Sequence, residues 1–185
     1  TGAKTLNTLA NSLWGKAKIG LEYALKRSGP MSMAPSQLGA FAKSRPDLAT
    51  ADLEYHVQPL SLEAFGQPLH SFPAMTASVC NLRPESRGSV QIASADAKAA
   101  PKIAPNYLST EGDRAVAVAA IRQAREIMAA PAMARYQPEE MKPGAHLSSD
   151  GELVAAAGEI GTTIFHPTCT VRMGTEDAAP LDAAC

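Results

Sequence analysis

Residues 52–59 read Asp-Leu-Glu-Tyr-His-Val-Gln-Pro and give the clearest indication of the fold. Apolar and polar side chains alternate along this stretch, which is typical of a β-strand with one buried face and one polar face. The apolar positions are Leu53, Tyr55 and Val57, and the polar positions are Glu54, His56 and Gln58. We therefore predict a strand here, with His56 on its polar face.

Further strands are predicted on the C-terminal side of this stretch. Two β-prone runs cover residues 75–82 and 89–94. The six residues between them, Arg83-Pro84-Glu85-Ser86-Arg87-Gly88, are rich in turn formers, so the two runs are predicted to pair as a hairpin with a longer loop. Residues 101–107 should be extended, because prolines at 101 and 105 disfavour helix in the residues that precede them.

On the N-terminal side, residues 5–27 carry apolar side chains at three- and four-residue spacing, which is typical of one helix face. The members of this face are Leu6, Leu9, Leu13, Ala17, Leu21, Ala24 and Leu25. We expect the basic side chains of the same helix to face outward, namely Lys16, Lys18, Lys26 and Arg27. Gly29-Pro30 should end the helix. Residues 31–44 show no clean period and are predicted to form a loop with one short helical turn.

Two more helices are predicted in the second half of the chain. Thr110, with Asp113 three residues later, resembles a capping box and should open a helix that ends before Pro131. Ser148-Ser149-Asp150 can cap a short helix that ends near Gly158. The order helix, strand, hairpin, helix and helix predicts an α+β fold, in which helices pack on one face of an antiparallel sheet.

The composition indicates a folded chain without strong bulk charge. Of 185 residues, 45% are hydrophobic and 19% are charged, and the net charge is -1. These values argue against disorder and against electrostatic binding to nucleic acid or anionic lipid. The three cysteines, Cys80, Cys169 and Cys185, are far apart and odd in number, so neither a disulfide framework nor a metal centre is predicted. No apolar run approaches the roughly 18 to 20 residues that cross a bilayer. We expect a cytoplasmic protein, or one held peripherally at the inner membrane.

Histidines are the main candidates for acid–base chemistry near neutral pH. His166 follows the apolar run 161–165, interpreted as a short strand, and enters a segment of small side chains that would let a backbone approach a planar ligand. A structural core histidine is an equal alternative there. Cys169, three residues later, leaves a Cys/His nucleophile as a weaker one. His70 and His146 are expected to be solvated or structural.

The common cofactor and catalytic fingerprints do not occur in the sequence. It contains no GxGxxG, GxxxxGK[ST], GxSxG or HExxH. The chain alone therefore offers no dinucleotide cradle, phosphate loop, nucleophile elbow or zinc-binding helix of these kinds. Any cofactor must be held mostly by residues outside this chain.

Residues 166–174, His-Pro-Thr-Cys-Thr-Val-Arg-Met-Gly, resemble the HPxxTxRMG segment near the C-terminus of the glucose-methanol-choline oxidoreductases, flavoenzymes that oxidise alcohols with FAD. Residues 46–48, 55–59, 82–88 and 101–108 also resemble segments of that family and occur in its order. The resemblance covers nearly the whole chain and looks closest to the choline dehydrogenase-like alcohol dehydrogenases.

The resemblance implies a domain organisation. Residues 1–165 would form the substrate-binding domain, and residues 166–185 would begin the return to an FAD-binding domain of Rossmann type that is absent here. The chain begins without Met and stops at Cys185 without a capped element, so we expect both ends to be cut. The family's second active-site residue would follow Cys185, and the isolated piece is expected to be inactive.

The resemblance also implies roles for individual residues. His166 would accept the hydroxyl proton of a small-molecule alcohol while hydride passes to the flavin. Pro167 and Thr168 would lie near the flavin, and His56 and Arg83 would contact the substrate. A cation at position 83 suits a substrate other than a quaternary ammonium compound. The alternative from another class is a binding or interaction domain that keeps the fold without redox work.

Overall fold

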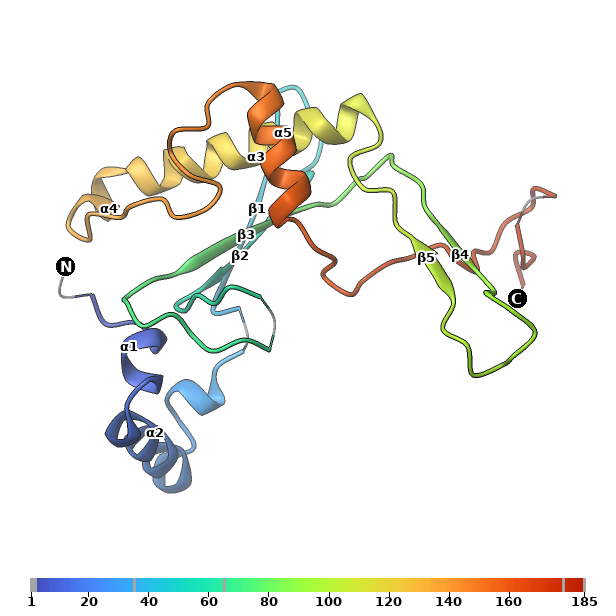
Figure 1. Cartoon of the computed structure of the whole chain (residues 1–185). Helices are drawn as coiled ribbons and strands as arrows, with labels where there is room; N and C mark the ends of the chain where they lie inside the picture. The colour runs from blue at the N-terminus through green and yellow to red at the C-terminus, as the bar shows by residue number, and fades with distance from the viewer. Residues whose placement is uncertain (1–2, 35, 65, 178, 185) are drawn as a thin grey trace. The chain divides into compact units, whose positions relative to one another are not determined.

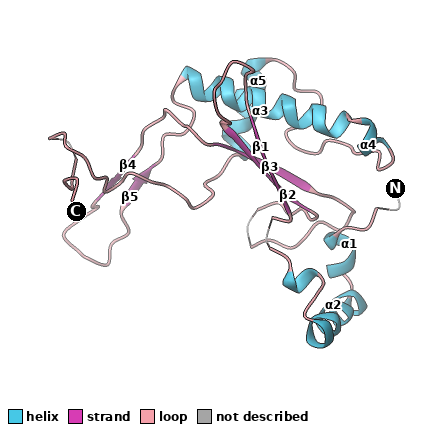
Figure 2. Ribbon diagram, turned by 180° about the vertical axis from the view of Figure 1, so that it is seen from behind, coloured by secondary structure: helices cyan, strands magenta, loops and turns pink. Residues whose placement is uncertain are grey.

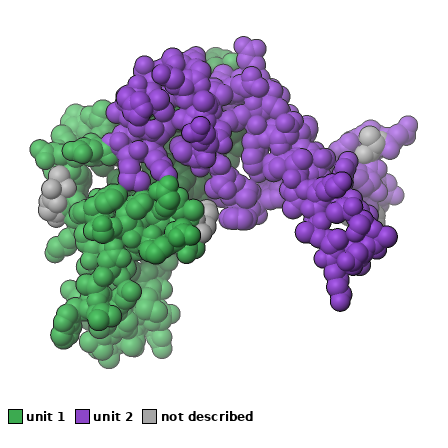
Figure 3. Space-filling view, in the orientation of Figure 1, with its two compact units in different colours: residues 1–83, 118–139 green, residues 84–117, 140–185 purple. Residues whose placement is uncertain are grey.

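The computed structural model describes residues 3–34, 36–64, 66–177 and 179–184, and the chain divides into two compact units (Figure 3). Unit 1 comprises Thr1–Arg83 and Val118–Glu139. Unit 2 comprises Pro84–Ala117 and Glu140–Cys185. Helices and antiparallel strands both occur, which confirms the predicted α+β class (Figure 2).

Unit 1 is built around a three-stranded antiparallel sheet in the order β1-β2-β3 (Figure 1). The strands are β1 (Leu38–Ala42), β2 (Leu53–Gln58) and β3 (Thr76–Asn81). The predicted strand is therefore confirmed as β2, the central one. β1 was not predicted, since Leu-Gly-Ala-Phe-Ala has no alternation. It forms because β2 offers it a pairing edge, and four of its five residues are exposed.

The buried face of the sheet is covered by helix α3 (Glu111–Ala129), whose residues from 118 onward belong to unit 1. Leu53 and Tyr55 are 0% and 2% exposed. The Tyr55 hydroxyl lies 3.0 Å from the Ala120 carbonyl oxygen and 3.0 Å from Oε1 of Gln123, so two acceptors on α3 share its proton. Burial, followed by the charge of Glu126, raises the pKa of Tyr55 to about 12.

The N-terminal segment forms two helices, α1 (Leu6–Ala10) and α2 (Leu13–Lys26), so the single helix predicted over 5–27 is wrong. Ser12 starts the second helix, since its Oγ accepts a hydrogen bond from the Gly15 amide at 2.9 Å. A Cβ at Gly15 would lie 1.8 Å from the Leu9 carbonyl oxygen, so only glycine permits this close turn. The short turn Pro30–Ser32 (η1) agrees with the turn predicted in the following loop.

The apolar side of α2 is exposed together with its basic side chains. Leu13, Trp14, Leu21 and Leu25 are 86%, 87%, 61% and 74% exposed. The spacing that marks an amphipathic helix is present, but this helix turns its apolar side away from the rest of unit 1.

The strand pairing in unit 2 contradicts the predicted hairpin. β4 (Ser89–Gln91) pairs antiparallel with β5 (Lys102–Ala104), whereas β3 pairs with β2. The loop after residue 83 does not return the chain to β3, because the Asp113 carboxylate accepts hydrogen bonds from the backbone amides of Glu85 and Ser86. The extended segment predicted over 101–107 contains β5, which agrees with the prediction.

The helices of the second half match their predicted caps. Thr110 Oγ1 accepts a hydrogen bond from the Asp113 amide at 3.1 Å at the start of α3. α4 (Pro131–Ala134) follows α3, and α5 (Asp150–Ile160) begins at the Ser149 cap, where Glu152 completes a capping box. α5 continues two residues beyond the predicted end. None of the helices in the described ranges is long and apolar enough to cross a bilayer.

Candidate active site

The segment that contains His166 is an exposed loop of unit 2. Residues 161–165, predicted as a strand, are not one: Phe165 adopts a left-handed conformation with φ 64°, which no strand residue has. Cys169 is also left-handed, with φ 68°. His166, Pro167 and Thr168 are all exposed. No hydrogen bond or ion pair joins the His166 imidazole to the described residues, so its ring nitrogens are open to a ligand from outside this chain.

The C-terminal end of the same segment is fixed by backbone contacts. Met173 and Leu181 form a parallel bridge. The Gly174 amide donates to the Leu181 carbonyl at 3.0 Å, and the Leu181 amide donates to the Arg172 carbonyl at 3.4 Å. Arg172 also pairs with Glu176, with Nη1 and Oε1 2.9 Å apart. The loop is thus tethered after residue 171, while the His166 end stays open.

His56 lies on the face of β2 opposite to Tyr55, as predicted. Its side chain is half-buried, and Nε2 lies 3.6 Å from Oε1 of Glu54, beyond hydrogen-bond distance. Nε2 is buried and has no hydrogen-bond partner in the described part of the chain. A buried nitrogen in this state is usually satisfied by a water molecule or a ligand.

Ser78 and Cys80 on β3 line the same face as His56. Ser78 lies opposite His56 in the sheet register, and Cys80 lies opposite Glu54. Burial, followed by the charge of Glu54, raises the pKa of the Cys80 thiol. The face therefore presents an imidazole, a hydroxyl and a protonated thiol around one carboxylate, all of which can form hydrogen bonds with a polar ligand.

Arg83 lies two residues after the end of β3 and is exposed. Its Nη2 donates a hydrogen bond to Thr50 Oγ1 at 3.1 Å, and its backbone amide donates to Asn81 Oδ1 at 2.9 Å. These contacts orient the side chain, and a guanidinium has five N–H donors. Donors remain for a polar or anionic group of a ligand.

Asp113 organises the turn after Arg83, a role that the sequence did not reveal. The carboxylate is 5% exposed and accepts hydrogen bonds from the amides of Glu85 at 2.9 Å and Ser86 at 2.8 Å. Burial acts to raise the pKa of Asp113, but the hydrogen bonds from Ser86, Glu85 and Thr110 outweigh it and hold the pKa below its ordinary value. The only sequence signal was the spacing from Thr110, which indicated a helix cap.

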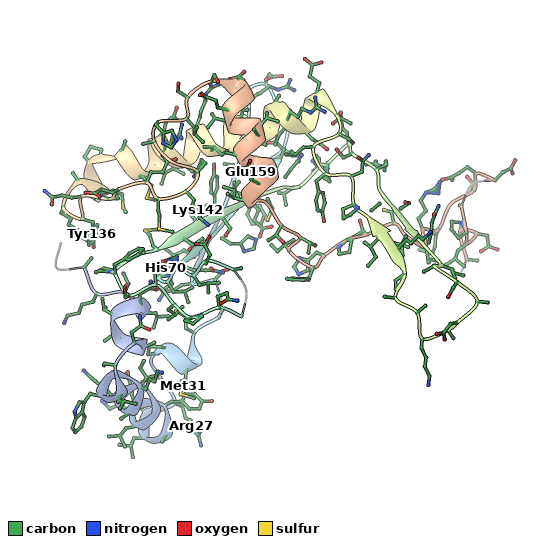
Figure 4. The ribbon with its side chains drawn as sticks, viewed as in Figure 1. Arg27, Met31, His70, Tyr136, Lys142 and Glu159 are labelled. Atoms are coloured by element: carbon green, nitrogen blue, oxygen red, sulfur yellow. The ribbon has the colours of Figure 1, made fainter. Side chains whose placement is uncertain are left out.

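His70 belongs to a second polar cluster, at the junction of α1 with the segment after β2 (Figure 4). Its Nδ1 lies 2.9 Å from Ser61 Oγ, and its Nε2 lies 3.6 Å from Glu63 Oε2. A serine, a histidine and an acid in contact can form a hydrolytic site. Here the buried Asn7 side chain also donates to Ser61 Oγ at 3.1 Å and accepts from the Ser61 amide at 2.9 Å. These bonds indicate a structural clip that binds α1 to the loop.

The predicted site residues fall into two groups. His166, Pro167 and Thr168 belong to unit 2, and His56 and Arg83 belong to unit 1. Cys169 is exposed and its Sγ contacts Thr168 Oγ1 at 3.5 Å, with no contact to His166 that would activate a nucleophile. Within the described ranges, no cluster of three or more His, Cys, Asp or Glu side chains could hold a metal ion.

Comparisons with known proteins place the chain among oxidoreductases. A family model described as GMC oxidoreductase matches residues 84–185. The oxygen-dependent choline dehydrogenase of Burkholderia multivorans is 37% identical over 169 residues, which cover 91% of this chain and 30% of the relative. The protein of the same name from Vibrio vulnificus is 37% identical over 174 residues, which cover 93% of this chain and 31% of that relative. The chain thus spans about 30% of the length of these curated relatives.

A solved structure matches the fold as well. The crystal structure of pyridoxine 4-oxidase from Mesorbium loti superimposes with a TM-score of 0.71 at 24% sequence identity. The match covers 80% of this chain and 30% of that chain. At this identity the likeness concerns the fold alone.

Proposed function

The chain belongs to the GMC oxidoreductase family, and from this premise we propose that it is the substrate-facing part of a flavin-dependent alcohol dehydrogenase. In this proposal residues 1–165 form the substrate-binding domain, and residues 166–185 lead back to an FAD-binding domain. The observation that carries the proposal is the exposed His166 in a family segment, with no partner for its imidazole among the described residues.

The residues around His166 fit the ring end of FAD and offer nothing for its phosphates. The segment presents exposed backbone, small side chains and an unengaged imidazole, which suit the edge of a flat, largely apolar ring system. The sequence has no glycine-rich phosphate cradle. Pro167 and Thr168 would border the ring system, and FAD, when bound, supplies the acceptor for the hydride. The phosphates would be held elsewhere.

His166 acts in this proposal as the proton acceptor. A ring nitrogen of its imidazole takes the proton of the substrate hydroxyl, which leaves an alkoxide-like oxygen on the carbon that loses hydride. A histidine suits this step, since its ordinary pKa lies near neutral pH. The exposed imidazole must be enclosed by other parts of the enzyme before the reaction, because water in the site would compete for the proton.

His56 and Arg83 are proposed to contact the alcohol. The buried Nε2 of His56 without a hydrogen-bond partner supports a role in binding a polar substrate group. Arg83 places a cation at the end of β3, so we propose a substrate other than a quaternary ammonium alcohol. Choline appears in the names of the relatives, and we do not propose it as the substrate of this chain. We propose that the enzyme is cytoplasmic or held peripherally at the inner membrane, in accord with three scattered cysteines.

The test of the catalytic proposal is a pair of histidine variants in the enzyme that contains this chain and its FAD-binding domain. His166→Ala should slow flavin reduction by the alcohol by at least about 100-fold and leave flavin content unchanged, because loss of a general base typically costs that much. His146→Ala removes another exposed histidine of unit 2 and should reduce flavin at the wild-type rate. Unchanged reduction in His166→Ala would remove that residue from the mechanism.

The domain proposal has its own test. The 185-residue chain mixed with FAD and a panel of alcohols should neither retain the flavin nor bleach it. Turnover by this chain alone would overturn the assignment of the phosphate-binding site to a separate domain. A chain that binds proteins or other ligands but never supports flavin reduction, even when joined to an FAD-binding domain, would favour the alternative of a non-catalytic binding domain.

A further inference from the structure

Helix α2 has an apolar side that none of the described residues of unit 1 covers. At about 100° per residue, six apolar positions of the helix, 13, 14, 17, 21, 24 and 25, fall within an arc of about 120°, and Ile19 lies outside this arc. We call these residues the α2 arc: Leu13, Trp14, Ala17, Leu21, Ala24 and Leu25. All six are exposed, and Leu13 and Trp14 are 86% and 87% exposed. A shallow groove at the Trp14 and Lys18 edge of this side is lined by Trp14, Gly15, Ala17, Lys18 and Leu21.

The opposite side of α2 faces the protein. A Cβ at Gly15 would collide with the Leu9 carbonyl oxygen, so this position faces α1. Glu22 lies against the turn after the helix, where a Cβ at Gly29 would meet its carboxylate at 2.7 Å. Ser28 Oγ donates to Glu22 Oε1 at 3.4 Å. These contacts fix the rotation of α2 about its axis, so the exposure of the arc is a consequence of how the helix docks.

The charges next to the α2 arc are all positive. Lys18 borders the arc on one side and Lys16 lies beyond its other edge, and both are exposed. Figure 4 places Arg27 and Met31 at the same end of unit 1 as α2, and Met31 is 57% exposed. Glu22, the one acid of the helix, is half-buried beside Ser28 and Gly29.

The net charge of the chain conceals this asymmetry. Residues 1–34 contain five basic side chains and one acidic side chain, while the remaining residues contain 12 basic and 17 acidic ones. The N-terminal helices therefore carry a positive charge on an otherwise acidic protein. Bulk charge argues against anionic lipid as a partner, but the local distribution favours it.

We propose that α2 binds flat on an anionic lipid surface, with the α2 arc inserted among the headgroups and the flanking lysines against the phosphates. Leucine and tryptophan flanked by lysine are typical of helices that lie in a membrane interface. Lysine stems reach past apolar side chains and keep their ammonium groups at the phosphate level. A second copy of the chain fits this face poorly, because two basic rims would be brought together.

Trp14 provides a direct probe, since it is the single tryptophan of the sequence. In buffer its emission should be that of an exposed indole. Vesicles of phosphatidylcholine and phosphatidylglycerol in equal parts should shift the emission to the blue and co-sediment with the protein. Binding to vesicles of phosphatidylcholine alone should be at least about tenfold weaker than binding to the mixed vesicles, because the anionic headgroups are missing. Roughly 0.5 M salt should weaken binding to the mixed vesicles by a similar factor, because salt screens exposed charges.

Two pairs of variants separate the apolar and the ionic contributions. Leu21→Ser should weaken sedimentation with the mixed vesicles by about tenfold, whereas Ile92→Ser, at an 88% exposed site in unit 2, should not change it. Lys16→Glu should weaken sedimentation with the mixed vesicles to a similar degree. Lys98→Glu makes the same charge change in unit 2 and should leave sedimentation unchanged. The helical circular dichroism of each variant should equal that of the wild type, since all four sites are exposed.

Three results would overturn the proposal. One is a Trp14 emission that stays unchanged with mixed vesicles. Another is a blue-shifted emission without vesicles together with a dimer mass in solution, which would assign the face to a second copy. The third is vesicle binding by the longer enzyme that Leu21→Ser leaves intact, which would place the lipid contact outside the arc. None of these measurements uses a substrate, so the proposed activity stands or fails separately.

Discussion

Replacing Asp113 by alanine is expected to release the turn after Arg83, because this carboxylate accepts two backbone hydrogen bonds, from Glu85 and Ser86. A hydrogen bond to a charged group contributes about 1.5 to 3 kcal/mol. Glu85 is exposed and Ser86 is half-buried, so water can replace part of each bond, and we take the lower value. The expected loss is therefore about 3 kcal/mol for the two bonds, or about a 100-fold change in the local opening equilibrium.

Amide hydrogen exchange measured by NMR tests this estimate at the two donors. In Asp113→Ala, the Glu85 and Ser86 amides should exchange about 100-fold faster than in the wild type. Asp113→Asn should show about half the free-energy change, because one amide oxygen can still accept. The matched control is Asp96→Ala, which removes one exposed bond from the Lys98 amide at 2.9 Å and should change the stability by less than about 0.5 kcal/mol.

The same contacts give a pH dependence with a definite sign. The pKa of Asp113 is below its ordinary value, so its bonds stabilise the folded state fully above the unfolded pKa of about 3.9. This contribution is lost as the pH falls through the lower folded pKa. The stability difference between the wild type and Asp113→Ala should therefore shrink at acid pH. Wild-type exchange at Glu85 and Ser86 in Asp113→Ala, with helix α3 intact, would refute the reasoning.

Three further predictions concern other parts of the chain. Leu53→Ala should lower the free energy of unfolding in urea by about 2 to 4 kcal/mol, because Leu53 is fully buried; a loss below about 1 kcal/mol would contradict its place in the core. The Glu152 carboxyl should titrate by NMR near pH 2, because the backbone and side chain of Ser149 donate to it, so this capping interaction weakens only as the pH falls toward that value. A midpoint near the ordinary 4.5 would exclude the capping box. Alkylation at pH 8 should modify the exposed Cys169 well before Cys80, whose pKa is raised by burial and by Glu54, and peptide mapping that found the opposite order would contradict this assignment.

The elements that the sequence predicted well are those whose signals are local. The alternation over Leu53–Gln58 comes from contiguous residues, and this strand is confirmed as β2. Helix starts at Thr110 and Ser149 were also predicted, because a cap is formed by side chains within three residues of the helix. The family resemblance rests on short motifs and agrees with the family match.

The candidate residues came from sequence patterns, but their structural setting could not be predicted. The motif singled out His166, and the alternation placed His56 on the open face of β2. No local pattern indicated that His166 lies exposed in a loop with left-handed residues on either side, or that Asp113 holds the turn after Arg83. Such features depend on which distant groups meet in the folded chain.

The sequence by itself determined the central strand β2, the starts of α3 and α5, and which residues resemble a family motif, because these properties follow from neighbours along the chain. Only the tertiary structure decided that β3 pairs with β2 and β4 with β5, and that α2 turns its apolar arc outward. Strand pairing depends on which edge is free, and helix rotation depends on contacts such as that of Gly15 with Leu9. An amphipathic pattern marks an apolar face, but the physical partner of that face is set by docking.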